Sequence, residues 1–166
     1  MIKVAFLFDP KNDWLRQHIP QSLVNRKDVN LELLYDSQDT ESFEIVFVLG
    51  YTKILPQSFI EQNGLALVVH ESDLPKGKGF SPVQWQILEG KNNITVSLIE
   101  LAQEVDSGDI FEQTEIKLDG SELYKDIRSA QANATFKLVE HWSMGLIAVT
   151  TVGSAWNNNF KWWLAT

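Results

Sequence analysis

Short runs of hydrophobic residues, separated by polar turns, recur along most of the chain. The runs IKVAFLF, EIVFVL and LALVVH are almost continuously apolar, which is typical of strands in a sheet whose two faces are both covered. The overall pattern predicts six strands, at residues 2–8, 30–35, 44–49, 65–70, 94–101 and 110–118. Short helical segments are expected after residue 13 and at residues 56–62.

Helical patterns alternate with these strands. Ser81 and Pro82 mark the start of a helix, because serine is a favoured N-cap and proline fits the first helical position, and Gly90 marks its end. Apolar residues at helical spacing predict a longer helix over residues 121–142, with Ser121 as its N-cap. The alternation predicts an α/β domain with a mostly parallel central sheet flanked by helices. The candidate inward-facing residues of the helices are Trp14, Ile19, Leu23, Val83, Ile87, Leu88, Leu123, Ile127, Ala130, Ala134 and Leu138.

Composition and charge exclude several classes of protein. The 166 residues suffice for one domain with a substantial core. A net charge of -8 argues against a bulk electrostatic grip on nucleic acid. The absence of cysteine excludes disulfides and thiolate metal sites, and no motif indicates another metal site. The first apolar run is too short for a signal peptide, and no run reaches the roughly 20 residues of a membrane span, so we expect a cytoplasmic protein.

The C-terminal residues differ in character from the rest. Residues 144–152 are apolar, and four of the six tryptophans lie from Trp142 onward. We therefore expect a domain at residues 1–142 and an apolar, Trp-rich tail at residues 143–166. Such a tail either packs on the domain or forms a sticky surface, and a homodimer through this region is one expectation.

Two polar side chains stand out at the ends of apolar segments. His70 ends the predicted strand 65–70, and Asp106 lies in a tight Asp-Ser-Gly-Asp turn. A histidine and a carboxylate presented by strand ends and loops suit proton transfer at a carbonyl centre.

The segments around these residues resemble a known family. VVHESDLPKGKG (68–79) resembles the formyltransferase signature Asn-x-His-x-Ser-x-Leu-Pro with its glycine-containing loop. SPVQWQILEG (81–90) is similar to the helix that follows it, and EVDSGDIFEQ (104–113) resembles the Asp-x-Gly-x-Ile segment. Upstream, VLGYTKILPQSFIEQNGLALVVH (48–70) resembles the strand, loop and helix that lead into the signature. The resemblance runs densely from about residue 44 to residue 113.

The resemblance implies a Rossmann-like domain that moves a formyl group from 10-formyltetrahydrofolate to an amine. The folate would lie near the C-terminal ends of the central strands, as ligands of open α/β sheets generally do. His70 matches the family's histidine, a proton carrier or oxyanion donor, and Asp106 matches the aspartate that supports it. The resemblance places the folate contacts at Lys53, Ile54, Leu55 and Val105.

One residue of the signature is missing. The family's asparagine falls on Val68, which should share a strand face with His70 and cannot donate a hydrogen bond. An oxyanion donor is typically worth about 3 kcal/mol, or roughly 10²–10³ in rate. Three readings stay open: Thr52 or a backbone amide replaces the donor, the enzyme is slow on an unusual substrate, or the fold persists without formyl transfer.

The acceptor is predicted by elimination among the family's methionyl-tRNA, glycinamide ribonucleotide and sugar N-formyltransferases. Residues 9–14 (DPKNDW) hold no glycine and two carboxylates, so they make a poor phosphate loop. The additional C-terminal domain and basic surfaces of tRNA formyltransferases are not evident. A small amine acceptor remains, and a nucleotide-linked amino sugar fits best. A folate- or nucleotide-binding domain without turnover and a formyltetrahydrofolate hydrolase are the alternatives. The candidate acceptor contacts are Trp14, Thr52, Ser72 and Lys76.

Overall fold

A computed structural model of the chain describes residues 1–38 and 42–151, with side chains described up to residue 143. All six predicted strands are present, with ends within one residue of the expected ones, and the mostly parallel sheet is confirmed. The strands are β1 (Ile2–Phe8), β2 (Val29–Leu34), β3 (Ile45–Leu49), β4 (Leu65–His70), β5 (Asn93–Glu100) and β6 (Ile110–Lys117).

The six strands form one sheet in the order β2-β1-β3-β4-β5-β6. β1 pairs in parallel with β2 and β3, and β3 pairs in parallel with β4. β5 runs antiparallel to both of its neighbours. The C-terminal ends of β1 to β4 therefore lie next to one another. Ligands of open α/β folds usually bind at these strand ends.

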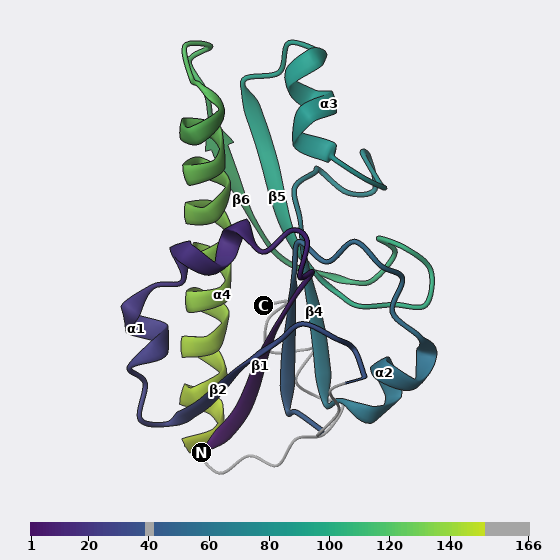
Figure 1. The fold of residues 1–166 in the computed structure, drawn as a ribbon, viewed down its shortest axis with the longest axis vertical. Coiled ribbons are helices and arrows are strands. Elements are labelled where there is room, and N and C mark those ends of the chain that lie inside the picture. The colour runs from purple at the N-terminus through teal and green to yellow at the C-terminus, as the bar shows by residue number, and fades with distance from the viewer. Residues whose placement is uncertain (39–41, 152–166) are drawn as a thin grey trace.

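Helices cover both faces of the sheet (Figure 1). They are the 3-10 helix η1 (Trp14–His18), α1 (Gln21–Val24), α2 (Gln57–Gln62), α3 (Pro82–Leu88) and α4 (Tyr124–Thr151). Residues of η1, α1, α3 and α4 pack in a first hydrophobic cluster on one face. Phe59 of α2 belongs to a second cluster on the other face. Within the described residues, no helix combines the length and apolar character needed to cross a bilayer.

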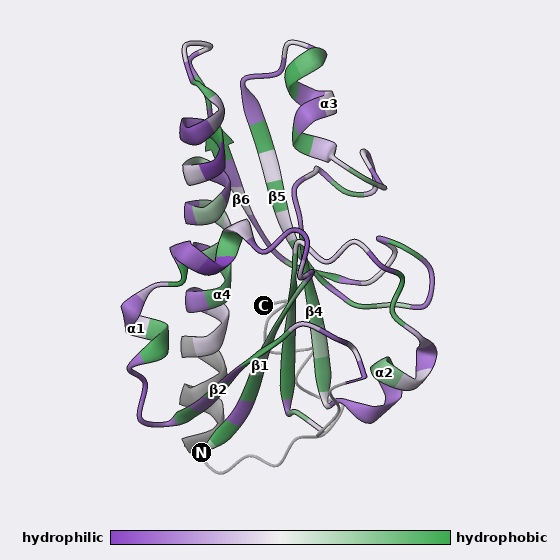
Figure 2. Ribbon diagram, in the orientation of Figure 1, coloured by the Kyte–Doolittle hydropathy of each residue, from purple (hydrophilic) through white to green (hydrophobic). Residues whose placement is uncertain are grey.

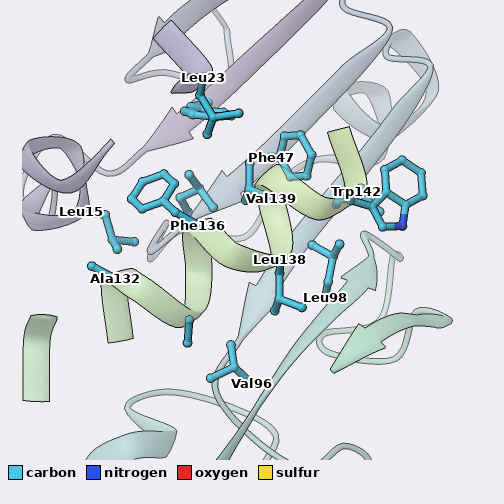
Figure 3. Packing of buried hydrophobic residues seen from close by; sticks show 14 of the residues in the cluster. Leu15, Leu23, Phe47, Val96, Leu98, Ala132, Phe136, Leu138, Val139 and Trp142 are labelled. Atoms are coloured by element: carbon cyan, nitrogen blue, oxygen red, sulfur yellow. The ribbon is translucent and has the colours of Figure 1, made fainter. Parts of the chain in front are cut away.

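The covering of both faces explains the continuous apolar runs. Phe6 and Phe8 of β1 point into the first cluster, whereas Ala5 and Leu7 between them point into the second. Figure 2 shows the central strands as mostly hydrophobic along their length, with hydrophilic segments at the periphery. Figure 3 shows the first cluster from close by, where Phe136 and other apolar side chains of α4 lie against the sheet.

Three sequence predictions about the helices were wrong. α4 begins at Tyr124, because the Asp126 carboxylate reaches back to accept a hydrogen bond from Leu123 N (2.9 Å), so Ser121 is not the N-cap. Leu123 lies before the helix and is 74% exposed. Leu88 is 78% exposed, because it is turned about 100° from Ile87, which packs against the first cluster.

Other predictions about the helices stand in part. Ser81 precedes α3 as expected, but its side chain makes no capping hydrogen bond and its φ is 57°. α4 continues beyond the predicted end at residue 142 as far as Thr151. The rest of the predicted tail, residues 152–166, lies outside the described residues. A homodimer through this region therefore stays a prediction.

Candidate active site

His70 is the last residue of β4 and lies at the edge where the parallel strands end. Along β4, Ala66 and Val68 face the second cluster, so the alternation of a strand directs His70 to the same side. The loop of residues 71–79 folds back over the imidazole, and His70 is only 7% exposed. The site is thus built from a strand end and the loop that follows it.

The structure brings His70 and Asp106 together, although they are far apart in sequence. His70 Nδ1 lies 3.6 Å from Asp106 Oδ1. The other carboxylate oxygen, Oδ2, accepts a hydrogen bond from Gly79 N at 2.8 Å. On the far side of the ring, His70 Nε2 lies 2.9 Å from the carbonyl oxygen of Gly77. The loop therefore orients both members of the pair through its backbone.

These contacts assign the protons of the pair. A carbonyl oxygen can only accept, so Nε2 of His70 donates to Gly77 and carries the proton of the neutral ring. Nδ1 then presents its lone pair towards Asp106. At 3.6 Å Nδ1 and Asp106 Oδ1 are too far apart for a direct hydrogen bond, which leaves Nδ1 able to take a proton from a third group. The resulting imidazolium would be stabilised by Asp106.

The glycines of the signature loop are required by its path. Gly77 has a φ of 72°, and a Cβ there would lie 2.9 Å from the Cβ of Ser72. A larger residue would therefore be strained and would push the carbonyl away from His70. Asp106 also has a positive φ, 51°, which aspartate tolerates better than most residues.

Several supporting residues were missed by sequence reasoning. Ser97 of β5 is fully buried and donates from Oγ to the Ser72 carbonyl (2.7 Å), while Gln113 of β6 donates to Ser97 Oγ (2.9 Å). Gln86 of α3 donates from Nε2 to the Glu71 carbonyl (2.8 Å). Polar residues within otherwise apolar strands were the signal that could have revealed Ser97. Together these bonds fix the start of the loop.

Thr52 is oriented away from the role of a substitute oxyanion donor. Its hydroxyl donates to Asp9 Oδ2, and Lys11 N donates to Asp9 Oδ1 (2.8 Å). The hydrogen bond from Thr52, followed by that from Lys11, holds the pKa of the buried Asp9 below its usual value. Thr52 thus ties the loop after β3 to the end of β1. A backbone amide remains as the candidate replacement for the missing asparagine.

Replacing Thr52 with valine tests this assignment. We expect a loss of about 1 kcal/mol in unfolding free energy at neutral pH, because a buried carboxylate loses a donor. The loss should shrink as the pH falls below about 4, where Asp9 becomes protonated, since a depressed pKa stabilises the fold only above it. Urea unfolding at several pH values measures this. A fall of 10²-fold or more in formyl transfer, in a folded variant, would instead make Thr52 the oxyanion donor.

The predicted folate contacts lie in the loops next to the pair. Lys53, Ile54 and Leu55 follow β3, and Val105 directly precedes Asp106. Leu55 packs against the second cluster, whereas Ile54 is 80% exposed and Val105 is also exposed. Lys53 is exposed, with its Nζ 5.9 Å from the centre of the Tyr51 ring.

The predicted acceptor contacts are scattered. Ser72 is 1% exposed, and its Oγ has no hydrogen-bond partner among the described residues, so it lies beneath the loop rather than on its surface. Lys76 is exposed on the loop. Trp14 is half-buried against the first cluster, and the guanidinium of Arg128 lies 4.4 Å from the centre of its ring.

A surface groove of about 480 Å³ lies elsewhere, beside η1 and α4. Its lining includes His18, Glu112, Lys137, Glu140 and His141 but neither His70 nor Asp106. We place the candidate active site at the His70–Asp106 pair, because His70 lies where the parallel strands end and a histidine beside a carboxylate suits proton transfer.

Comparison with known proteins supports a family assignment. Residues 4–141 match the formyl transferase family. A methionyl-tRNA formyltransferase from Lachnospira eligens is 28% identical over 121 residues, which cover 70% of this chain and 38% of that protein. The chain thus spans well under half the length of this relative.

Solved structures share the fold. A methionyl-tRNA formyltransferase from Clostridium thermocellum has a TM-score of 0.69 at 20% identity, covering 87% of this chain and 66% of that one. A 4-N formyltransferase from Francisella tularensis has a TM-score of 0.67 at 15% identity, covering 87% and 70%. Fold and site together define a Rossmann-like α/β domain with a histidine–carboxylate pair where its parallel strands end. The chain belongs to the formyl transferase family.

Proposed function

We propose that this domain transfers a formyl group from 10-formyltetrahydrofolate to the amine of a small acceptor, a nucleotide-linked amino sugar. The observation that carries the proposal is the approach of His70 to Asp106, 3.6 Å apart, with Gly77 and Gly79 holding the two side chains from the loop. Each of these residues belongs to a segment that resembles the family signature.

The surroundings of the pair fit a ring-bearing formyl donor. Tyr51, Leu55 and Leu101 pack beside Val68 against the second cluster, and all of them remain half-buried. They leave apolar surface on the side of the sheet that His70 faces, and apolar surface with a few polar groups is what such ligands need. The proposed donor contacts are Lys53, Ile54, Leu55 and Val105.

The chain's own residues would move one proton. The folate would supply a formyl group whose bond to its nitrogen breaks as the acceptor nitrogen forms the new bond. His70 Nδ1 takes the proton that the acceptor nitrogen loses, and Asp106 stabilises the imidazolium. Gly77 O holds the Nε2–H, so the ring keeps its orientation through the step. The same proton can then pass to the departing nitrogen, which balances the reaction.

Val68 leaves the developing oxyanion without the family's amide donor. Val68→Asn is expected to raise kcat about tenfold or more, because it adds a donor on the side of β4 that His70 faces. Steady-state rates at saturating donor and acceptor measure this. Val68→Ala is the matched control, since it shortens the side chain without adding a donor. An unchanged rate in a stable Val68→Asn protein would mean that a backbone amide already serves.

The proposed acceptor is free in the cytoplasm and is attached neither to nucleic acid nor to a membrane. The net charge of -8 supports this, because a phosphate backbone requires many cations. Residues 9–14, with no glycine, also make a poor phosphate loop after β1.

Val68 together with the enclosure of His70 favours a second candidate, a folate- or nucleotide-binding domain without turnover. Purified protein incubated with 10-formyltetrahydrofolate and a panel of uridine and thymidine diphosphate amino sugars separates the two. Formyl transfer should appear as release of tetrahydrofolate. The mass of the acceptor should also rise by about 28 Da, because a formyl group replaces one hydrogen of the amine. Binding without release would favour the second candidate. Formate release without any acceptor would indicate a hydrolase.

A further inference from the structure

Glu71 is a partly buried carboxyl group next to the proposed reaction centre that no step above uses. It directly follows β4, and its backbone carbonyl is held by Gln86 of α3. Its side chain turns the other way, because Glu71 Oε1 accepts a hydrogen bond from Gln131 Nε2 of α4 at 3.2 Å. Gln131 is itself buried. The carboxylate therefore lies on the α4 side of the strand end, opposite the side that His70 faces.

A cation stands on the same side, held between two aromatic rings. The Arg128 guanidinium lies 4.4 Å from the centre of the Trp14 ring and 5.2 Å from that of Tyr124. Arg128 donates from Nε to Tyr124 Oη (3.1 Å) and from one terminal nitrogen to Gln131 Oε1 (3.4 Å). Gln131 thus links Arg128 to Glu71 through its amide. The arginine is half-exposed and Tyr124 is exposed, so the guanidinium can be reached from solvent.

Burial raises the pKa of Glu71, against the attraction of His70, the hydrogen bond from Gln131 and the attraction of Arg128. The groups whose charge acts on the carboxylate are therefore Arg128 on α4 and, when it is protonated, His70 at the end of β4. The group contributed from α3, Gln86, is uncharged. A carboxylate with a raised pKa is a stronger proton acceptor than an ordinary glutamate.

The two sides of the strand end differ in chemistry. On the side of the second cluster, Tyr51, Leu55 and Leu101 offer apolar surface. On the α4 side, Glu71 offers an anion and Arg128 a stacked cation. A donor bound on the first side and an acceptor bound on the second would meet over the end of β4, where His70 lies. The polar side suits a zwitterionic ligand, which carries both an ammonium group and an anion.

We propose that Glu71 binds the acceptor's amine and that Arg128, held between Trp14 and Tyr124, binds an anionic group of the same acceptor. The inference rests on the proposed formyl transfer and specifies its acceptor as an amine that also bears a phosphate or carboxylate. The ammonium N–H bond breaks and an O–H bond forms on Glu71, so the nitrogen keeps its electron pair for the attack. Glu71 then returns this proton to solvent.

The test compares Glu71→Gln with Glu89→Gln, which alters an exposed carboxylate that pairs with Lys91. Formyl transfer is measured with 10-formyltetrahydrofolate and the panel of nucleoside diphosphate amino sugars. Glu71→Gln should raise the KM for the acceptor about 10- to 100-fold, the range expected when a charged hydrogen bond is lost. It should leave the KM for the folate unchanged. Glu89→Gln should change neither constant.

The pH profile separates binding from a structural role. In the natural chain, kcat/KM should fall as the pH drops through the raised pKa of Glu71, and Glu71→Gln should lose this limb. Glu71→Asp should keep the limb while raising the acceptor KM. A raised pKa means that ionised Glu71 lowers the stability of the fold at neutral pH, so Glu71→Gln should melt at the same temperature as the natural chain or higher.

Arg128→Gln tests the anionic end of the acceptor. It should lower kcat/KM for phosphate-bearing amines about tenfold or more. Arg16→Gln is the control and should leave kcat/KM unchanged, because it alters an exposed arginine 5.9 Å from the centre of the Tyr35 ring. The inference would be overturned if the natural chain transfers the formyl group and Glu71→Gln has the same acceptor KM and the same pH profile. The proposed function would then remain intact. Failure of the natural chain to formylate any amine in the panel would overturn both.

Discussion

Replacing His70 with alanine is expected to lower kcat/KM for formyl transfer by about 10²- to 10⁴-fold, the usual contribution of a positioned acid–base group. In the proposed reaction the imidazole takes the acceptor's proton at Nδ1, which lies 3.6 Å from Asp106 Oδ1. Its removal leaves the carboxylate without a partner that carries protons. Steady-state kinetics with 10-formyltetrahydrofolate and the best acceptor of the panel measure the effect.

His141→Ala is the matched control for this experiment. His141 also pairs with a carboxylate, since its Nδ1 lies 2.7 Å from Glu112 Oε1, but its side chain is largely exposed on α4. We expect His141→Ala to keep the natural rate. If the His70→Ala protein folds and retains the natural kcat/KM, the catalytic role of His70 is excluded and the binding domain becomes the better account.

Replacing Gly108 with alanine is expected to destabilise the fold by about 4 kcal/mol or more, an unusually large effect for one methyl group. A Cβ at Gly108 would lie 1.8 Å from the carbonyl oxygen of Glu100, a backbone atom that cannot rotate away. Next to it, Glu100 N donates to Asp109 O at 2.9 Å. The loop would have to leave β5, and Asp106 would move with it.

Ser107→Ala tests whether this loss is specific. The Ser107 hydroxyl donates to Glu104 O at 2.7 Å on the surface of the same loop, so its removal should cost about 1 kcal/mol or less. Urea unfolding of the two variants measures both effects. Equal stability of Gly108→Ala and the natural chain would mean that the loop can pack away from β5 without loss.

The strands were predictable because their signal is local. Both faces of the sheet are covered, so strands such as β1 and β3 are apolar at almost every position and stand out against polar turns. The ends of the helices were predicted less well. Ser121 has the right chemistry for an N-cap, but Asp126 caps the helix instead. Which of two nearby polar side chains caps a helix depends on the path of the preceding loop.

The candidate site was likewise predictable only in its local features. The motif around His70 and the turn around Asp106 made both residues candidates from the sequence, since the spacing of histidine, serine, proline and glycine in the loop is itself local. Their separation of 3.6 Å required the fold, because the loop after β5 has to return to the end of β4. The bond from Thr52 to Asp9 likewise joins two loops that are distant along the chain.

The sequence by itself determined the class of fold and the order of its strands along the chain, and it singled out His70 and Asp106 as the candidate pair for proton transfer. The tertiary structure decided what surrounds that pair: the carbonyl that holds His70, and the link from Glu71 through Gln131 to Arg128 on α4. Periodicity and motifs record the neighbours of a residue along the chain. The charge, burial and hydrogen bonds of a side chain depend on residues that only folding brings near, and these properties are what the proposed acceptor site requires.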